Sequence, residues 1–272
     1  MTEPELTIEK DGRVTVIAIN RPANNNTLND AVLTQLRRSV SELETDGTRA
    51  VVIKGAGGVF SGGFDVSGKR PRSPAEMRDH ADLASDTFWR IWRSPLPYVA
   101  AAERYCLGGA VYFSGVCDFM VTSPSAEIGM FELRLGMAPP LFNLFPWMLG
   151  YRVAKQFLFT GDIVDGRRAL EWGLASHCVA DGQVIAESLK LAHRLAGMPD
   201  KVIATLKRSV NRRWELAGMV AGIEEDVEQF VRDKIDMGPI QREFRRLARD
   251  HGVAEAISRM GIELGLREQY RQ

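Results

Sequence analysis

The pattern of apolar residues changes along the 272-residue chain, and this change constrains the fold more than any other feature. Before about residue 145, short apolar runs typical of strands alternate with helical periodicities. This alternation predicts crossover units with largely parallel strands, and therefore an α/β fold. After about Phe145, strand-like runs almost vanish and helical periodicities take over. We therefore expect a core domain over residues 1–195 and a helical region over residues 196–272.

The chain begins with a hairpin pattern. Asp11-Gly12 separates a first strand-like run, Leu6–Lys10, from a second, Val14–Ile19, which is the signal for a tight turn between paired strands. The next predicted elements are a helix capped by Asn29 or Asp30, a strand at 50–53, a helix at 74–92, a strand at 98–102, a helix at 108–116 and a strand at 119–122. Four helices are predicted in the C-terminal region, around 202–210, 220–230, 244–248 and 253–260.

Charge and composition exclude several classes of protein. The 35 basic and 35 acidic residues cancel, so no broad cationic surface exists for a nucleic acid, and the dense cluster Arg242–Arg249 is interpreted as a solvated helix face. No apolar run is long enough to cross a membrane and the first residues are acidic and polar, so we expect no membrane association and a cytosolic protein. The spacing of the three cysteines and four histidines predicts buried thiols, no disulfide framework and no metal site.

Two glycine-rich segments follow predicted strands, at 55–65 and 100–110. The first lacks the Gly-Lys-Ser/Thr ending of a phosphate-binding loop, has Phe60 where a dinucleotide fingerprint needs glycine, and has Val59 where a nucleophile elbow needs it. The second runs into a predicted helix through Gly108-Gly109, where backbone N–H groups lack helical partners. Each loop alone is explained by turn formation or close packing. Together, one amide from each is suited to holding a carbonyl oxygen that becomes an enolate.

Several short segments form a recognisable set when they are taken in order. They are Asn20-Arg21-Pro22 with Leu28-Asn29, Ala50 to Gly55, Phe60 to Asp65, Leu107-Gly108-Gly109, Cys117-Asp118, Glu132 to Gly136, and Thr160-Gly161 with Ala169 to Leu174. At this order and spacing the chain resembles the crotonase family, also called the enoyl-CoA hydratase/isomerase superfamily, from about Val14 to Val179.

The resemblance implies an α/β fold made of a spiral of ββα units with a C-terminal helical region. It also implies homotrimers that often pair into dimers of trimers, and an acyl-CoA thioester as substrate, with no cofactor beyond the coenzyme A of that substrate. The two amides that polarise the thioester carbonyl in the family map onto the N–H groups of Phe64 and Gly109.

The carboxylates of this chain depart from the hydratase pattern. Hydratases of the family have one glutamate three residues after the second amide and another in the following loop. Here Tyr112 occupies the first position, and Glu132 occupies the second. A lone carboxylate is similar to the Δ3,Δ2-enoyl-CoA isomerases, in which one base moves a proton between the α- and γ-carbons. We expect Glu132 to be a base whose pKa is raised by apolar neighbours, against the alternative of a surface ion pair with Arg134, and Tyr112 to be a wall of the acyl pocket more than a catalyst.

The resemblance also assigns contacts with the coenzyme A moiety and the loops around it. The residues concerned are Asn24, Asn26, Gly62, Gly63, Asp65, Lys69 and Gly108. Asn24 replaces a customary basic residue, while the cluster Lys69–Arg72 suits the phosphates of the coenzyme but is equally explained as a basic loop. Other departures are Glu103-Arg104 in place of Asn-Gly, and Pro139-Pro140 after the glutamate loop. The bulky segment Leu141–Trp147 fits an apolar acyl group, helix packing or trimer contacts alike.

Two other functions compete with enoyl-CoA chemistry. The loss of one carboxylate and the Glu103-Arg104 change are consistent with a catalytically silent member that binds acyl-CoA or has a structural role. Hydrolysis of a CoA thioester is a third possibility, but it needs a nucleophilic water for which the sequence provides no second base.

Overall fold

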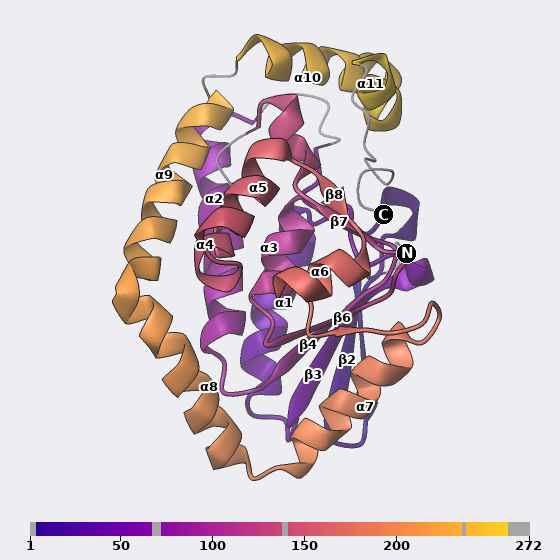
Figure 1. The fold of residues 1–272 in the computed structure, drawn as a ribbon, viewed down its shortest axis with the longest axis vertical. Coiled ribbons are helices and arrows are strands. Elements are labelled where there is room, and N and C mark those ends of the chain that lie inside the picture. Colours follow the sequence, from indigo (N-terminus) through magenta and orange to yellow (C-terminus); the bar gives the residue numbers. More distant parts are fainter. Residues whose placement is uncertain (1–3, 67–71, 138–140, 236–237, 261–272) are drawn as a thin grey trace.

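A computed structural model describes residues 4–66, 72–137, 141–235 and 238–260 (Figure 1). Its strands are β1 (Leu6–Asp11), β2 (Val14–Ile19), β3 (Ala50–Gly55), β4 (Tyr98–Ala102), β5 (Tyr105–Leu107), β6 (Phe119–Thr122), β7 (Glu127–Gly129), β8 (Ile163–Val164) and β9 (His177–Cys178). Its helices of α type are α1 (Asp30–Leu43), α2 (Pro74–Arg93), α3 (Gly109–Gly115), α4 (Phe145–Met148), α5 (Tyr151–Thr160), α6 (Gly166–Trp172), α7 (Val184–Gly197), α8 (Asp200–Trp214), α9 (Val220–Ile235), α10 (Pro239–His251) and α11 (Val253–Arg259). Short helical turns are η1 (Pro22–Asn24), η2 (Ala56–Gly58), η3 (Phe131–Leu135) and η4 (Glu215–Met219).

The strands form two sheets. The larger has the order β1-β2-β3-β4-β6-β9, and the smaller has the order β5-β7-β8. Within the larger sheet β1 and β2 form the predicted antiparallel hairpin, and every later pair is parallel. The α/β class and the parallel crossover units are thus confirmed. The strands that the sequence patterns did not show, β5, β7, β8 and β9, are two or three residues long, too short for an alternating pattern.

Both faces of the larger sheet are covered by helices. Val51 and Ile53 of β3 pack with α1, α2 and α3 in the main core, while Ala50 and Val52 face α7. This alternation follows from the two-residue period of a strand, and burial on both faces explains why the parallel strands read as continuous apolar runs. Asn29 caps α1 by accepting a hydrogen bond from the Val32 amide at 2.7 Å, as the sequence predicts.

The C-terminal helices wrap around this core (Figure 1). α8 is anchored by Lys207, whose buried ammonium group lies 2.8 Å from the Asp118 carboxylate and donates hydrogen bonds to the Ile91 and Leu96 carbonyls. The desolvation of both charges is offset only by this complete set of partners. α9 runs along α2, and α10 and α11 pack on η3. The four predicted C-terminal helices are confirmed, whereas the predicted boundary at residue 195 lies in the last turn of α7, and the division into two domains stays a prediction.

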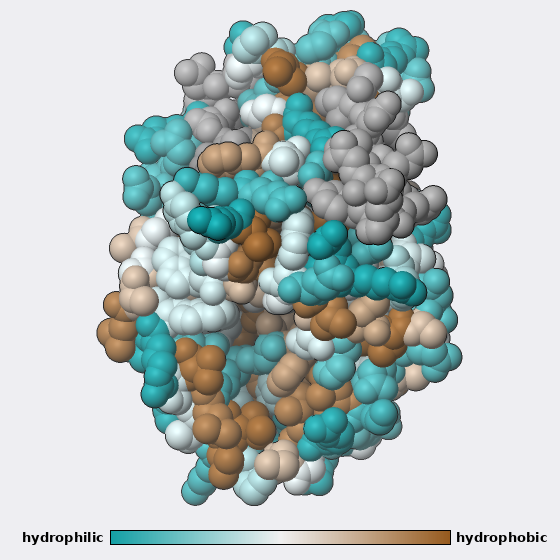
Figure 2. Space-filling view, in the orientation of Figure 1, coloured by the Kyte–Doolittle hydropathy of each residue, from teal (hydrophilic) through white to brown (hydrophobic). Residues whose placement is uncertain are grey.

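Two surface features bear on the sequence predictions. Val202, Leu206 and Val210 form an exposed apolar stripe on α8, which corresponds to the brown region at the lower left of Figure 2. None of the helices in the described ranges is long and apolar enough to cross a bilayer.

Cys106 and Cys117 are buried as expected, but Cys178 is only half-buried, because the short strand β9 lies at the edge of its sheet.

Candidate active site

Strand β5 brings the two glycine-rich loops side by side. The Ser61 amide donates to the Tyr105 carbonyl at 2.9 Å, and the Leu107 amide donates to the Ser61 carbonyl at 3.1 Å. The loop that follows β3 therefore pairs with the strand that leads into α3. Residues 61–64 and 107–109, distant in the sequence, meet at one place.

Glycines allow these backbones to touch. Gly63 has a φ of +94°, and a Cβ atom there would lie 2.5 Å from the Leu107 carbonyl oxygen and 3.0 Å from the Gly109 nitrogen. A Cβ atom on Gly109 would lie 2.7 Å from the Phe64 ring. A side chain at position 63 would have to move the backbone of the opposite loop, and one at position 109 would have to displace the Phe64 ring. The glycines at 63 and 109 are therefore needed for the approach itself.

The amides of Phe64 and Gly109 are available to an outside acceptor. Neither N–H group donates a hydrogen bond to another residue within the ranges that the structure describes. Gly109 is the first residue of α3, where helical N–H groups have no intrahelical carbonyl partner. The two N–H groups belong to loops in contact with each other. An oxygen atom with partial negative charge is the natural ligand for such a pair.

Glu132 approaches the second loop from η3. A Cβ atom on Gly108 would lie 3.0 Å from Oε2 and 3.1 Å from Oε1 of Glu132, so the carboxylate lies directly against the Gly108 backbone. The side chain is half-buried beside the buried Met130 and Met137. The alternative interpretation, an ion pair with Arg134, is wrong, because Arg134 binds Asp162 at 2.5 Å and no such pair with Glu132 forms among the described residues.

Tyr112 contacts Glu132 from α3. Its hydroxyl group donates a hydrogen bond to Glu132 Oε1 at 3.4 Å, and the side chain is 3% exposed. Burial raises the pKa of the Tyr112 phenol well above its ordinary value, and the neighbouring Glu132 carboxylate raises it further. The phenol is therefore neutral at physiological pH and acts as a hydrogen-bond donor.

Aromatic side chains line the side of the site beyond Glu132. The Tyr112 ring lies 6.3 Å from Phe64 and 6.0 Å from Phe145, measured between centroids, and Phe64 also contacts His80 edge-on at 5.2 Å. Of the bulky segment, Leu141, Phe142, Leu144 and Phe145 are buried. Helix packing therefore explains most of that segment, since Phe142 contacts Trp89 of α2 edge-on, with ring centroids 4.9 Å apart.

A group of charges lies beside Phe64, at the start of α1 and α2. His80 Nδ1 lies 2.6 Å from Asp30 Oδ1, and Arg72 Nη2 lies 3.0 Å from the same oxygen. The hydrogen bond with His80 is the main reason why the pKa of Asp30 is lowered. Arg245 of α10 is half-buried, and burial together with the charge of Arg72 lowers its pKa. The interpretation of Arg242–Arg249 as a solvated face is thus wrong for Arg245, which packs inward beside the buried Phe244.

The remaining predicted contact residues fall into different places. Asn24 is exposed in η1, and Gly62 donates its amide to the Asn25 carbonyl at 2.8 Å. Asp65 binds Arg21 at 2.8 Å. Lys69 lies outside the described residues.

Asn26, a predicted coenzyme contact, uses its side chain for hydrogen bonds within the protein. It is fully buried, accepts a hydrogen bond from the Arg21 amide at 2.9 Å and donates to the Ala56 and Val59 carbonyls. Its amide group therefore joins the loop at residues 21–26 to the first glycine-rich segment.

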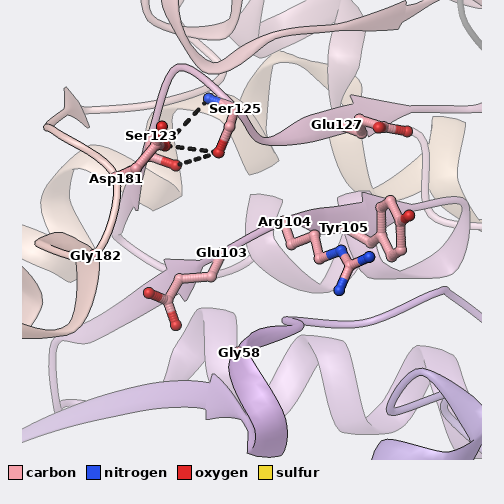
Figure 3. Close-up of a pocket in the computed structure, with 9 residues that line it drawn as sticks. All are labelled: Gly58, Glu103, Arg104, Tyr105, Ser123, Ser125, Glu127, Asp181 and Gly182. Carbon is pink, nitrogen blue, oxygen red and sulfur yellow. Dashed lines mark hydrogen bonds between the residues drawn. The ribbon is translucent and has the colours of Figure 1, made fainter.

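A separate cavity of about 370 Å³ lies at the other end of β5 (Figure 3). Its lining residues are Gly58, Glu103, Arg104, Tyr105, Ser123, Ser125, Glu127, Asp181 and Gly182. Figure 3 shows Asp181 bound to Ser125, at 2.6 Å, with Arg104 reaching into the space opposite. Arg104 has a φ of +56°, a conformation that favours glycine. The strand β5 separates this cavity from the amides of Phe64 and Gly109, so it is not the site described above.

The sequence analysis missed three residues near the site, His80, Arg245 and Asp226. Asp226 lies on the buried face of α9, and its charge raises the pKa of Tyr112. Helical periodicity offered a signal, because Asp226 falls between Ile223 and Phe230 on the predicted apolar face. His80 offered no such signal, because its neighbours come from other helices.

Known proteins resemble this chain in sequence and in fold. The family model for enoyl-CoA hydratase/isomerase matches residues 9–240. A short-chain-enoyl-CoA hydratase of Clostridium acetobutylicum is 29% identical over 209 residues, which cover 75% of this chain and 80% of that protein. A crotonyl-CoA hydratase of Syntrophomonas wolfei is 26% identical over 240 residues, 87% of this chain and 89% of that protein.

Solved structures agree with the sequence comparison. The crystal structure of an enoyl-CoA hydratase/isomerase from Xanthobacter autotrophicus superposes with a TM-score of 0.89 at 31% identity, covering 94% of this chain and 97% of that one. An enoyl-CoA hydratase from Mycobacterium smegmatis gives a TM-score of 0.85 at 27% identity, covering 94% and 92%. The predicted crotonase-like fold is confirmed, and the chain belongs to the enoyl-CoA hydratase/isomerase family, the crotonase superfamily.

Proposed function

We propose that the protein acts on an enoyl-CoA thioester, with Glu132 as the sole carboxylate base that reaches the reacting carbons, and that it shifts a double bond in preference to adding water. The observation that carries this proposal is the meeting of the Phe64 and Gly109 amides beside the Glu132 carboxylate. Both hydratases and isomerases of the family need these parts, but hydration needs a second group to activate water. Tyr112 is a neutral phenol at that place and a poor base.

In the proposed reaction, the Phe64 and Gly109 amides hold the thioester and Glu132 moves the proton. The thioester oxygen accepts hydrogen bonds from Phe64 N–H and Gly109 N–H, and each donor stabilises the developing negative charge by roughly 3–4 kcal/mol. Glu132 removes a proton from the α-carbon of a 3-enoyl-CoA, which gives a dienolate, and returns the proton to the γ-carbon. The double bond moves from C3–C4 to C2–C3, and Glu132 is again a carboxylate at the end of the reaction. The Tyr112 hydroxyl group orients Glu132 through Oε1.

Arg72 and Arg245 are the proposed contacts for the phosphates of coenzyme A, together with Lys69. The positive charge of Arg72 contributes to the lowered pKa of Arg245, so the two guanidinium groups repel each other. Arg245 has no carboxylate partner among the described residues. Like charges held together favour a shared anion. A homotrimer is proposed as the assembly, and the apolar stripe of Val202, Leu206 and Val210 supports it, because exposed apolar stripes are typical of interfaces.

The test is a comparison of Glu132→Gln with the unaltered protein. We expect unaltered protein to convert 3-enoyl-CoA into 2-enoyl-CoA, followed by ultraviolet absorbance of the conjugated thioester, and the variant to lose about 10²–10⁴-fold in rate. Binding of CoA, measured by calorimetry, should persist. Glu103→Gln, at the separate cavity, is the matched control and should keep full activity.

Two results would contradict the proposal. Formation of 3-hydroxyacyl-CoA from 2-enoyl-CoA faster than the double-bond shift would favour hydration. Absence of deuterium exchange at the α-carbon of bound acyl-CoA would favour the catalytically silent alternative, because an oxyanion site with a base should catalyse that exchange.

A further inference from the structure

Asp226 is an acidic residue on the inward face of α9. Asp226 is three residues after the buried Ile223 and four residues before the buried Phe230, so the three share one face of the helix. Asp226 is half-buried. Glu224, Glu225 and Glu228 of the same helix are exposed.

Packing directs this face toward the active site. Gly222, one helical turn before Asp226, lies against α4, and a Cβ atom there would come within 3.1 Å of the Trp147 indole. From the same short helix, Phe145 packs on the Tyr112 ring at 6.0 Å. An ion pair between Arg78 and Glu228, at 2.6 Å, ties the outer side of α9 to α2. α4 therefore joins the Asp226 face of α9 to the Tyr112 side of the site.

The electrostatics agree with this placement. The charge of Asp226 raises the pKa of Tyr112, in addition to the larger effects of burial and Glu132. Burial raises the pKa of Asp226 itself to about 7, with a contribution from Glu225. Within the described part of the chain, Asp226 forms no hydrogen bond or ion pair. A half-buried carboxyl group among apolar side chains needs a polar partner, and the protein supplies none there.

We propose that Asp226 determines specificity at the far end of the acyl site, and that the protein prefers acyl groups with a hydroxyl group there over plain hydrocarbon chains. The inference rests on the proposed function, in which the thioester oxygen lies at Phe64 and Gly109 and the acyl chain passes Glu132. Carbons beyond the γ-carbon then extend toward Tyr112 and α4. A hydroxyl group suits either form of Asp226, because it donates to a carboxylate and accepts from a protonated carboxyl group.

Binding of unreactive saturated thioesters tests this preference without any need for turnover. The ligands are acyl-CoA thioesters of four to eight carbons, each paired with its ω-hydroxy counterpart, titrated into the full-length protein by calorimetry. For at least one chain length we expect the hydroxy compound to bind about tenfold or more tightly than the hydrocarbon compound. Asp226→Leu should abolish or reverse this ratio, and Asp226→Asn, close in size, should retain part of it.

Glu224→Leu is the matched control, since it makes the same change on the exposed face of α9 and should leave the ratio unaltered. No hydroxyl preference at any chain length, or a preference that survives Asp226→Leu, overturns the inference while the proposed function stands. Failure of every acyl-CoA and of CoA itself to bind would instead overturn the proposed function. Asp226→Asn keeps the test valid should Asp226→Leu fail to fold.

Discussion

The two ends of the active site are built in different ways. At the proposed carbonyl end, the backbone forms the site, because Gly63 and Gly109 let two loops touch, and Gly108 leaves room for the Glu132 carboxylate. At the proposed acyl end, side chains come from separate elements, with Tyr112 from α3, Phe145 from α4 and, by our inference, Asp226 from α9. An added Cβ atom at position 63 or 109 would clash with the opposite loop, whereas the acyl end is defined by the side chain that each helix contributes.

This difference separates what the family shares from what is particular to this chain. A thioester oxygen is the same in every acyl-CoA, so a rigid backbone site suits it. Acyl groups vary, and substitutions such as Tyr112 alter one wall without moving the loops. The carbonyl end should therefore respond to mutation with loss of folding and activity together, and the acyl end with changes of selectivity and pH dependence.

The largest change in the free energy of unfolding is expected from Gly63→Ala. Its Cβ atom would lie 2.5 Å from the Leu107 carbonyl oxygen, and its φ of +94° strains any residue with a side chain. Together these should lower the free energy of unfolding by about 2–5 kcal/mol. Urea denaturation followed by circular dichroism measures the change. Activity should fall even where the variant remains folded, because the Gly109 amide must move.

Gly12→Ala is the control for the backbone strain alone. Gly12 has a φ of +61°, but a Cβ atom there meets nothing within 4 Å. The expected loss is only about 1–2 kcal/mol, with activity unchanged. If both variants lost the same stability, the close contact of the two loops would not be the reason for glycine at position 63.

A smaller change in the free energy of unfolding, and of opposite sign, is expected from Asp226→Asn at the acyl end. Burial raises the pKa of Asp226 to about 7, so at pH 8 the folded protein holds a half-buried carboxylate without a partner among the described residues. The amide removes that charge. Allowing for screening by solvent, we expect a gain in stability on the order of 1–2 kcal/mol at pH 8, measured by thermal unfolding.

The pH dependence of that gain has a definite direction. Below about pH 4 the carboxyl group of Asp226 is neutral in the folded and unfolded chains, so the variant and the unaltered protein should match. Between about pH 4 and pH 7 only the unfolded chain ionises, and the stability of the unaltered protein falls as the pH rises. The difference should grow through this window and level off above it. A constant difference from pH 4 to pH 8 would show that Asp226 is not the titrating group.

The contrast between an end formed by local backbone and an end formed by side chains of distant helices also explains how far the sequence predicted the structure. The hairpin, the parallel strands, the C-terminal helices and the two glycine-rich loops follow from local patterns, whereas the choice of Phe64 and Gly109 within those loops came from the resemblance to the family. The hydrogen bonds of the Asn26 side chain were not foreseen, because its acceptors are carbonyl groups of another loop. Arg245 was missed because the packing of α10 turns it inward, whereas Asp226 lies on the predicted apolar face of α9 but the elements that this face packs against are distant in sequence. Proximity between distant helices is a property of tertiary packing, which periodicity alone does not specify.

The smallest effect is expected from Tyr112→Phe, which tests where the two ends meet. The lost hydrogen bond to Glu132 is long, at 3.4 Å, so stability should fall by only about 0.5–1 kcal/mol. If the phenol only orients the carboxylate, the rate of the double-bond shift should fall less than about tenfold, and the ring contacts with Phe64 and Phe145 should remain. Steady-state rates with 3-enoyl-CoA measure this. A loss of about a hundredfold or more would mean that the phenol transfers a proton itself, and position 112 would then belong to the chemistry of the carbonyl end and not to the acyl wall.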